Sequence, residues 1–310
     1  MARHTVSLPG SRNVPSLEIA SHGRGGPASP TRFTPAQLAL IARTVRRTPE
    51  VMVKVSGGGR TMSAVEAHLK YIDRHGRLDL ETDDGDRLRG KSVERQLVTS
   101  WDLDADSGRF LTAQRTAKPR RPPKQVHNII LSMPTKTDAN KLLAACRVFA
   151  RENFALKHRY AMVLHTDQAH PHVHLVVKAE SEQGVRLNIR KATLREWREQ
   201  FAGQLRSVGV AANASPRAVR GLANTRMPAG LYRVLQRRES RLPGQSQARV
   251  PAVPSKAQAA SPLAVTQWRA VARILSRTRE QGLANEVERY AAGIGVKPEI
   301  RRQESQERQR

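Results

Sequence analysis

Apolar residues recur along the chain with two different periods, which predict strands and helices in alternation. Short apolar runs rich in β-branched residues are typical of strands, and they lie at 51–55, 126–132, 159–165 and 171–179. Longer segments repeat apolar residues at helical spacing, and they lie at 35–47, 62–74, 139–153 and from 193 onwards. This order favours an α+β fold in which helices flank a central, mainly antiparallel sheet.

The helix predicted at 62–74 separates its apolar residues from its aromatic ones. Val65, Leu69 and Ile72 share one stripe and are expected to face the core. Tyr71 falls on another stripe together with His68, so its ring is expected to face away from the core. A tyrosine at a helix edge is most often an amphipathic packing residue, so this position alone assigns Tyr71 no function.

Local signals mark two helix starts and one core position. Thr34 followed by Pro35 predicts a capped helix start. Thr193, with Glu196 three positions later, predicts a capping box at the start of another helix. Cys146 lies on the apolar stripe of the helix at 139–153, where we expect a core thiol with no role as a nucleophile.

Composition divides the chain into four segments. Residues 1–50 are expected to form a flexible basic arm with a short helix, and 51–225 the folded domain. Residues 226–262 are predicted to be a basic segment and linker, and 263–310 helices followed by a disordered tail. The part beyond the folded domain is therefore predicted to be a basic extension, partly helical and partly disordered.

Charge makes a polyanion the first expected partner. The 310 residues contain 54 Lys and Arg against 27 Asp and Glu, a net charge of +27. Nucleic acid is the first candidate and an anionic membrane surface the second. One cysteine excludes an intrachain disulfide and Cys-rich zinc modules, and it fits a reducing, cytoplasmic setting. No apolar run approaches the roughly 20 residues of a membrane span, so we expect no membrane insertion.

The densest chemical signal is a group of histidines at the last two predicted strands. Four of the ten histidines fall in the stretch from His165 to His174. His172 and His174 point to one face of their strand, and His165 ends the preceding strand, so three imidazoles can converge as metal ligands. Asp167 and His170 lie in the connection, where they can support the ligands through hydrogen bonds.

Three stretches in matching order resemble one family. His172-Val173-His174 with the upstream His165 resembles the HUH motif of conjugative relaxases, which nick DNA at a transfer origin. The stretch from Tyr71 to Leu80 is similar to the tyrosine motif of the VirD2-like (MOBP-type) branch, and 128–134 is similar to its second motif. The resemblance covers about 51–225 and implies a fold like that of HUH endonucleases, in which the sheet carries the histidines.

The resemblance implies a strand-transfer reaction. Tyr71 would attack a phosphodiester and keep the 5′-phosphate, which conserves the bond for rejoining. His165, His172 and His174 would hold a divalent metal that polarises the phosphate. All-imidazole ligation favours Mn²⁺ or a later metal, whereas Mg²⁺ is abundant. His165 is either a ligand or a general base, and Asp167 could orient it.

The resemblance also implies DNA contacts and partners. Ser132 and Arg74 lie in the matched motifs, and Lys178 stands where the family often has Asn, so all three are candidate DNA-binding residues. The expected partners are single-stranded DNA at a transfer origin, accessory DNA-binding proteins and the coupling protein of a type IV secretion system. The expected location is the bacterial cytoplasm.

Tyr160 is the rival nucleophile among the four tyrosines. Tyr232 and Tyr290 lie outside the matched motifs. Tyr160 lies five positions before His165, so strand alternation places the two side chains on opposite faces. Tyr160 is therefore expected to pack in the core.

Three other functions share parts of this pattern. A histidine-triad nucleotide hydrolase or transferase would use His172 as nucleophile without a metal, because 170–176 fits that signature; the net charge, His165 and the Tyr71 stretch argue against it. An accessory DNA-binding protein with a structural metal would be expected to offer four ligands, where this cluster offers three. Replication-initiator HUH endonucleases share the site chemistry and differ only in lacking the VirD2-like stretches.

Overall fold

The computed structural model describes residues 32–103, 122–220 and 262–294. The predicted arm before residue 32, most of the predicted linker (226–261) and the predicted tail after residue 294 lie outside the described residues. The chain divides into two compact units, one formed by Thr48–Ala214 and the other by residues from both ends of the chain. The predicted limits of 51–225 for the folded domain stay a prediction.

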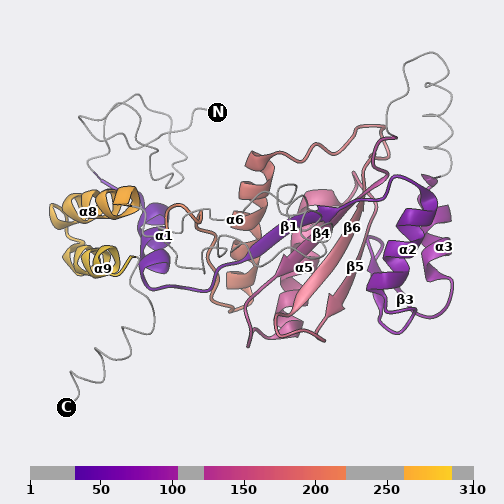
Figure 1. Ribbon diagram of the computed structural model, residues 1–310, viewed down its shortest axis with the longest axis horizontal. Coiled ribbons are helices and arrows are strands. Elements are labelled where there is room, and N and C mark those ends of the chain that lie inside the picture. The colour runs from indigo at the N-terminus through magenta and orange to yellow at the C-terminus, as the bar shows by residue number, and fades with distance from the viewer. Residues whose placement is uncertain (1–31, 104–121, 221–261, 295–310) are drawn as a thin grey trace, which may run out of the picture. The chain divides into compact units, whose positions relative to one another are not determined.

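The larger unit is built on a six-stranded sheet, in which every neighbouring pair is antiparallel. Across the sheet the order is β1 (Met52–Gly57), β4 (Val126–Ser132), β6 (His172–Lys178), β5 (Tyr160–His165), β2 (Leu80–Thr82) and β3 (Arg87–Leu88). Helices flank this sheet (Figure 1). The predicted α+β class and the antiparallel sheet are confirmed.

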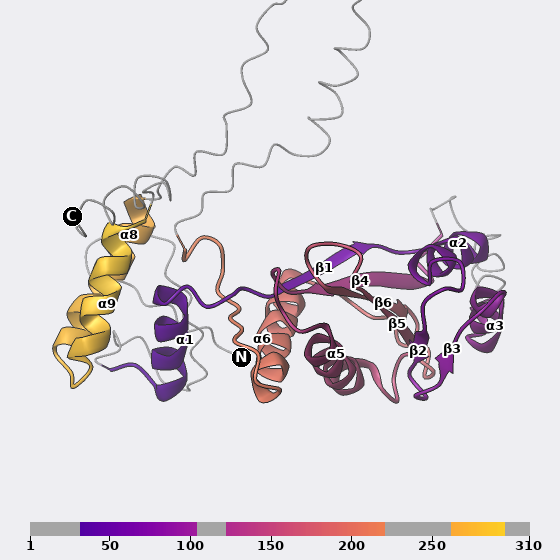
Figure 2. The same ribbon diagram turned by 90° about the horizontal axis from the view of Figure 1, so that it is seen from below.

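One face of the sheet is covered by α5 (Ala139–Phe154) and α6 (Lys191–Ser207), as Figure 2 shows. Alternate residues of β4 and β6, such as Leu131 and Leu175, are buried here in one core with Phe149 and Phe201. Cys146 is also completely buried in this core, as predicted for a packing thiol. Helices α5 and α6 pack against this face, so the site forms on the opposite face of the sheet.

The opposite face is only partly covered. Helices α2 (Met62–Ile72) and α3 (Val93–Ser100) pack over β5, β6 and β2, and Val65, Leu69 and Ile72 are buried there as predicted. Tyr71 is 55% exposed and faces away from this core, which confirms its predicted orientation. Toward β1 the face is open, and Met52 is 46% exposed. The histidines lie at the end of β5 and the start of β6, next to this open part of the face.

Two features differ from the sequence prediction. Helix α6 begins at Lys191, two residues before the predicted start, and the Thr193 hydroxyl accepts a hydrogen bond from the Arg190 amide. Thr193 therefore lies within the first turn and is not the capping residue. Strands β2 and β3 were not predicted, because strands of two or three residues are too short to show a period. Helix α3, of eight residues, was not predicted either.

The smaller unit joins the two ends of the chain in one hydrophobic core. It contains α1 (Pro35–Val45), α8 (Pro262–Ser276) and α9 (Gln281–Ala292). Thr34 caps α1 as predicted, since its hydroxyl accepts from the Gln37 amide. Trp268 and Tyr290 pack edge to face, with ring centroids 5.2 Å apart. Among the helices that the structure describes, none is long and apolar enough to cross a membrane.

Candidate active site

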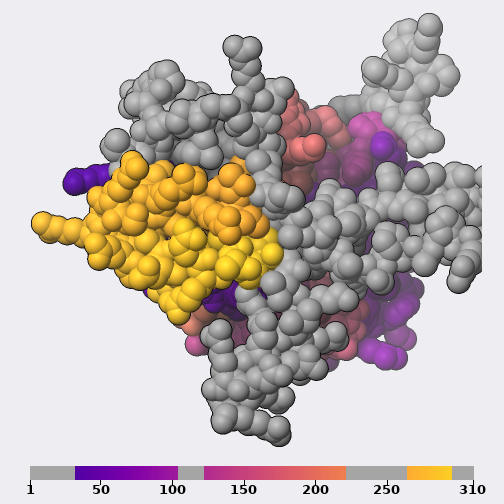
Figure 3. Space-filling view, turned by 60° about the vertical axis from the view of Figure 1, so that its left-hand side comes forward, coloured from indigo at the N-terminus to yellow at the C-terminus, as the bar shows by residue number. Residues whose placement is uncertain are grey.

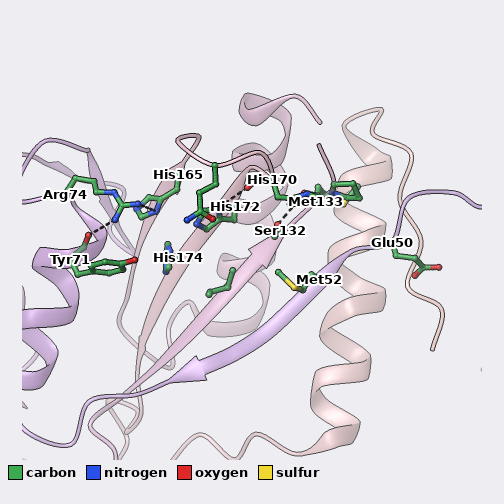
Figure 4. A pocket seen from close by; sticks show the side chains of 13 residues that line it. Glu50, Met52, Tyr71, Arg74, Ser132, Met133, His165, His170, His172 and His174 are labelled. Atoms are coloured by element: carbon green, nitrogen blue, oxygen red, sulfur yellow. Dashed lines mark hydrogen bonds between the residues drawn. The ribbon is translucent and has the colours of Figure 1, made fainter. Parts of the chain in front are cut away.

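A pocket opens at the uncovered end of the sheet face. Three histidines from β5 and β6 form its floor, and Tyr71 and Arg74 approach from α2 and the turn after it (Figure 4). Met52 of β1 and Ser132 of β4 line the opposite side. The pocket therefore combines residues that lie far apart in the sequence of the larger unit.

Strand register brings the three histidines together. His165 pairs directly with His172, and His174 pairs with Val163 on the same strand as His165. Directly paired residues of antiparallel strands point to the same face, so all three imidazoles share one side of the sheet. The ring centroids lie 4.5 to 5.1 Å apart, and one nitrogen from each ring lies within 4.8 Å of the others.

Two of these histidines are held in the neutral form that a metal requires. Burial lowers the pKa of His165 and lowers the pKa of His174 to about 3, so both rings are neutral at pH 7. His172 Nδ1 donates to the His170 carbonyl at 3.0 Å, because a carbonyl oxygen can only accept, so Nε2 is the His172 nitrogen that would face a metal. The donor set fits a divalent transition metal.

Both ring nitrogens of His165 have hydrogen-bond partners, and these limit its role as a metal ligand. Its Nε2 donates to the Ile72 carbonyl at 2.6 Å, so its lone pair is at Nδ1. Arg74 Nη2 lies 3.3 Å from that Nδ1 and donates to it. A metal and the Arg74 guanidinium would therefore compete for the same lone pair of His165.

The two residues expected to support the ligands do so by indirect routes. Asp167 pairs with Arg74 at 2.5 Å, and it is Arg74 that reaches His165. The ion pair lowers the pKa of the Asp167 carboxyl and raises the pKa of Arg74. His170 acts through its backbone carbonyl, while its side chain is exposed at the pocket rim.

Tyr71 extends from the last turn of α2 toward the histidines (Figure 4). Its ring stacks on His68, with centroids 6.3 Å apart, and the Arg74 guanidinium carbon lies 5.2 Å from the ring centroid. Arg74, His75 and Gly76 all have positive φ, so the chain reverses sharply after α2. This reversal brings the Arg74 side chain back over the Tyr71 ring.

The three candidate DNA-binding residues have different surroundings. Arg74 lines the pocket. Ser132 also lines it, although its hydroxyl is buried and donates to the Pro171 carbonyl at 3.1 Å. Lys178 is buried at the far end of β6, does not line the pocket, and lies 3.8 Å from Glu182. Lys178 thus lies away from the histidines, and its role in DNA binding stays a prediction.

The β1 side of the pocket was not identified from the sequence. Met52 begins β1 and Glu50 lies just before it, and both line the pocket. The Glu50 carboxylate accepts a hydrogen bond from the Asn213 side chain at 3.1 Å. The only sequence signal was strand alternation, which places Met52 on the exposed face of β1 but does not show which strand lies beside the histidines.

Comparison with known proteins connects this site to a family. Residues 90–207 match the relaxase family described as MobA/VirD2-like, nuclease domain. The T-DNA border endonuclease VirD2 of Agrobacterium fabrum is 27% identical over 206 residues, and that of Rhizobium radiobacter is 25% identical over 209 residues. Each match covers 62% of this chain.

Over this range the chain is similar to VirD2-like relaxases. The matched range of the family includes the histidine strands but begins after Tyr71. The chain spans about half the length of the curated relatives it matches, with 45% and 47% of those proteins covered. A solved MobM relaxase domain bound to 26-nucleotide oriT DNA is 14% identical with a TM-score of 0.37, and the match covers 54% of this chain and 91% of that one.

Replacing Arg74 should impair the site more than replacing Asp167. Arg74→Ala removes contacts to Asp167, His165 and Tyr71 together, whereas Asp167→Asn removes only an exposed ion pair. We expect Asp167→Asn to slow DNA nicking by about fivefold or less, and Arg74→Ala by more than about tenfold. Single-turnover nicking rates would measure both, and equal rates for the two variants would contradict this role of Arg74.

Proposed function

We propose that this protein nicks and rejoins one DNA strand at a transfer origin, with Tyr71 as the nucleophile. The observation that carries the proposal is the position of an exposed tyrosine in the same pocket as three buried histidines, two of them with lowered pKa values. The family of residues 90–207 supports a DNA phosphodiester as the substrate. Tyr71, the proposed nucleophile, lies outside that matched range but lines the same pocket.

The proposed reaction exchanges one phosphodiester for another. Tyr71 Oη forms a bond to phosphorus while the bond from phosphorus to the 3′-oxygen breaks. The tyrosine proton passes to a base, and the 3′-oxygen takes up a proton to leave as a 3′-hydroxyl. The 5′-phosphate stays on Tyr71, so attack by a 3′-hydroxyl reverses the step and rejoins the strand without an external energy source.

The residues around Tyr71 contribute orientation and charge. His68 and Arg74 contact its ring from two directions and restrict its rotation. Arg74 also carries a positive charge beside the position proposed for the phosphate. A divalent metal, Mg²⁺ or Mn²⁺, held by His165, His172 and His174 would add charge neutralisation on the phosphate oxygens.

The histidine-triad alternative has less support. It uses His172, the middle histidine of the signature at 170–176, as the nucleophile and gives a tyrosine no role. In this structure the first histidine of the signature, His170, is exposed in the connection before β6, and Tyr71 lines the same pocket as His172. The family match is to relaxases. We keep the relaxase reaction as the proposed function.

The proposal is tested with single-stranded oligonucleotides that tile the DNA neighbouring the gene. The full chain is incubated with the set and Mg²⁺ or Mn²⁺. We expect one oligonucleotide to be cut at one position and its 5′-phosphate half to become attached to protein. Cleavage at many unrelated positions, or release of a free 5′-phosphate, would contradict a site-specific transferase.

The remaining partners follow from this function. A protein that nicks at a transfer origin acts on cellular DNA, so the proposal includes the bacterial cytoplasm as its location. It also includes accessory DNA-binding proteins and the coupling protein of a type IV secretion system as partners of the DNA-bound form. Co-purification of these proteins with the covalent adduct, and not with free protein, would support this part.

A further inference from the structure

The outer face of α8 carries a row of arginines in the unit formed by the two ends of the chain. Arg269 and Arg273 lie on α8, and Arg277 follows its last residue. They are four positions apart, so they follow one stripe over roughly 12 Å. All three are exposed, whereas Trp268 and Leu275 of the same helix are buried in the core. In Figure 3 the atoms of α8 (orange) and α9 (yellow) face the viewer.

These arginines differ from others of the unit in their surroundings. Arg46, just after α1, pairs with Glu286 of α9 at 2.8 Å. Among the described residues, no carboxylate lies within ion-pair distance of Arg269, Arg273 or Arg277. Over 32–47, 215–220 and 262–294 the unit has eleven arginines, three glutamates and no lysine. The arginine row is therefore a concentrated positive surface that internal pairing does not explain.

The choice of arginine and the burial of the aromatic rings indicate the kind of ligand. A guanidinium binds phosphate through two parallel hydrogen bonds, which suits a regular phosphate backbone. Single-stranded nucleic acid is usually held by bases stacked on exposed aromatic rings. In the described part of this unit, Trp268 and Tyr290 are buried and Phe33 is partly buried against the same core. The surface fits the backbone of a duplex better than unpaired bases.

We propose that Arg269, Arg273 and Arg277 form a second DNA site that binds the phosphate backbone of duplex DNA without sequence preference. The choice of DNA over another polyanion rests on the proposed function, while the site itself lies outside the catalytic unit. Because both units belong to one chain, duplex binding would raise the local concentration of the nicking site near the same DNA. This site would hold the duplex flanking the strand that is cut.

The test compares two double variants of the full chain. Arg269→Gln/Arg273→Gln removes two charges from the row, and Arg46→Gln/Arg289→Gln removes two charges from elsewhere in the same unit. Affinity for a duplex and for a single strand is measured over a range of salt concentrations. We expect only the first variant to weaken duplex binding, by about tenfold, and to reduce the salt slope by about two. Single-strand affinity should change little.

Further variants and ligands distinguish a duplex DNA site from a general effect of charge and from binding of other polyanions. Arg269→Lys/Arg273→Lys keeps the charges but not the paired hydrogen bonds, so it should keep the wild-type salt slope and recover only part of the duplex affinity. Equal losses in both Gln variants would mean a general effect of net charge and would overturn the proposal. The proposal would also be overturned if the first Gln variant lost affinity for anionic vesicles or duplex RNA but not for duplex DNA. Since binding is measured without cleavage, failure of the nicking reaction would not alter these results.

Discussion

Tyr71→Phe should form no covalent DNA adduct and should nick DNA at least about a thousandfold more slowly than the wild type. The substitution removes only the hydroxyl. The stacking on His68 and the contact of the Arg74 guanidinium with the ring can remain, and only the polar interaction of the Tyr71 side chain with Arg74 is lost. The side chain is 55% exposed, so no buried hydrogen bond is lost and the fold should be unaffected. Binding of single-stranded DNA and of metal should therefore stay near wild type.

Tyr160→Phe is the matched control for this variant. Tyr160 is buried on the opposite face of the sheet, where its ring packs against Phe154 with centroids 6.4 Å apart. The burial confirms the position predicted from strand alternation. The control should nick DNA and form the adduct at close to the wild-type rate. Loss of the adduct in both variants, with both folded, would contradict the assignment of Tyr71.

Replacing His172 and His174 together by Ala should abolish nicking and metal binding. The variant removes two of the three nitrogen donors, and one histidine alone holds a divalent metal weakly. We expect nicking to fall at least about a hundredfold and Mn²⁺ binding, measured by calorimetry, to be lost. A circular dichroism melt checks the fold, because both residues are buried in β6.

His170→Ala is the control for the metal site. It keeps the backbone carbonyl that accepts from His172 and removes only an exposed imidazole. This variant should retain metal binding and most of the nicking activity. Full nicking by wild-type protein after chelation, with no metal detected, would contradict the role of the three histidines.

The sequence predicted the central part of the site because that part is local. Strand alternation places His172 and His174 on one face, and the short connection between the two strands brings His165 beside them. The stripe that exposes Tyr71 is likewise a property of one helix. The roles of these residues stay predictions, although their proximity is a feature of the structure.

The sequence could not predict contacts between distant segments. That β1 lies beside β4, with Met52 lining the same pocket as the histidines, depends on sheet order, which no local pattern encodes. The same is true of Arg74 reaching both Asp167 and His165, and of α1 sharing a core with α8 and α9. Short strands such as β2 are formed by pairing with β5 and not by their own pattern.

Mass spectrometry of the trapped adduct tests the central claim most directly. Trypsin cleaves after Lys70 and Arg74, so Tyr71 falls on a peptide that ends at Arg74, whereas Tyr160 begins a separate peptide after Arg159. The wild-type protein is incubated with its cut oligonucleotide, digested with nuclease and trypsin, and sequenced by fragmentation. We expect the residual nucleotide phosphate on the Tyr71 peptide and on no other. Its presence on a peptide that lacks Tyr71 would contradict the proposed mechanism.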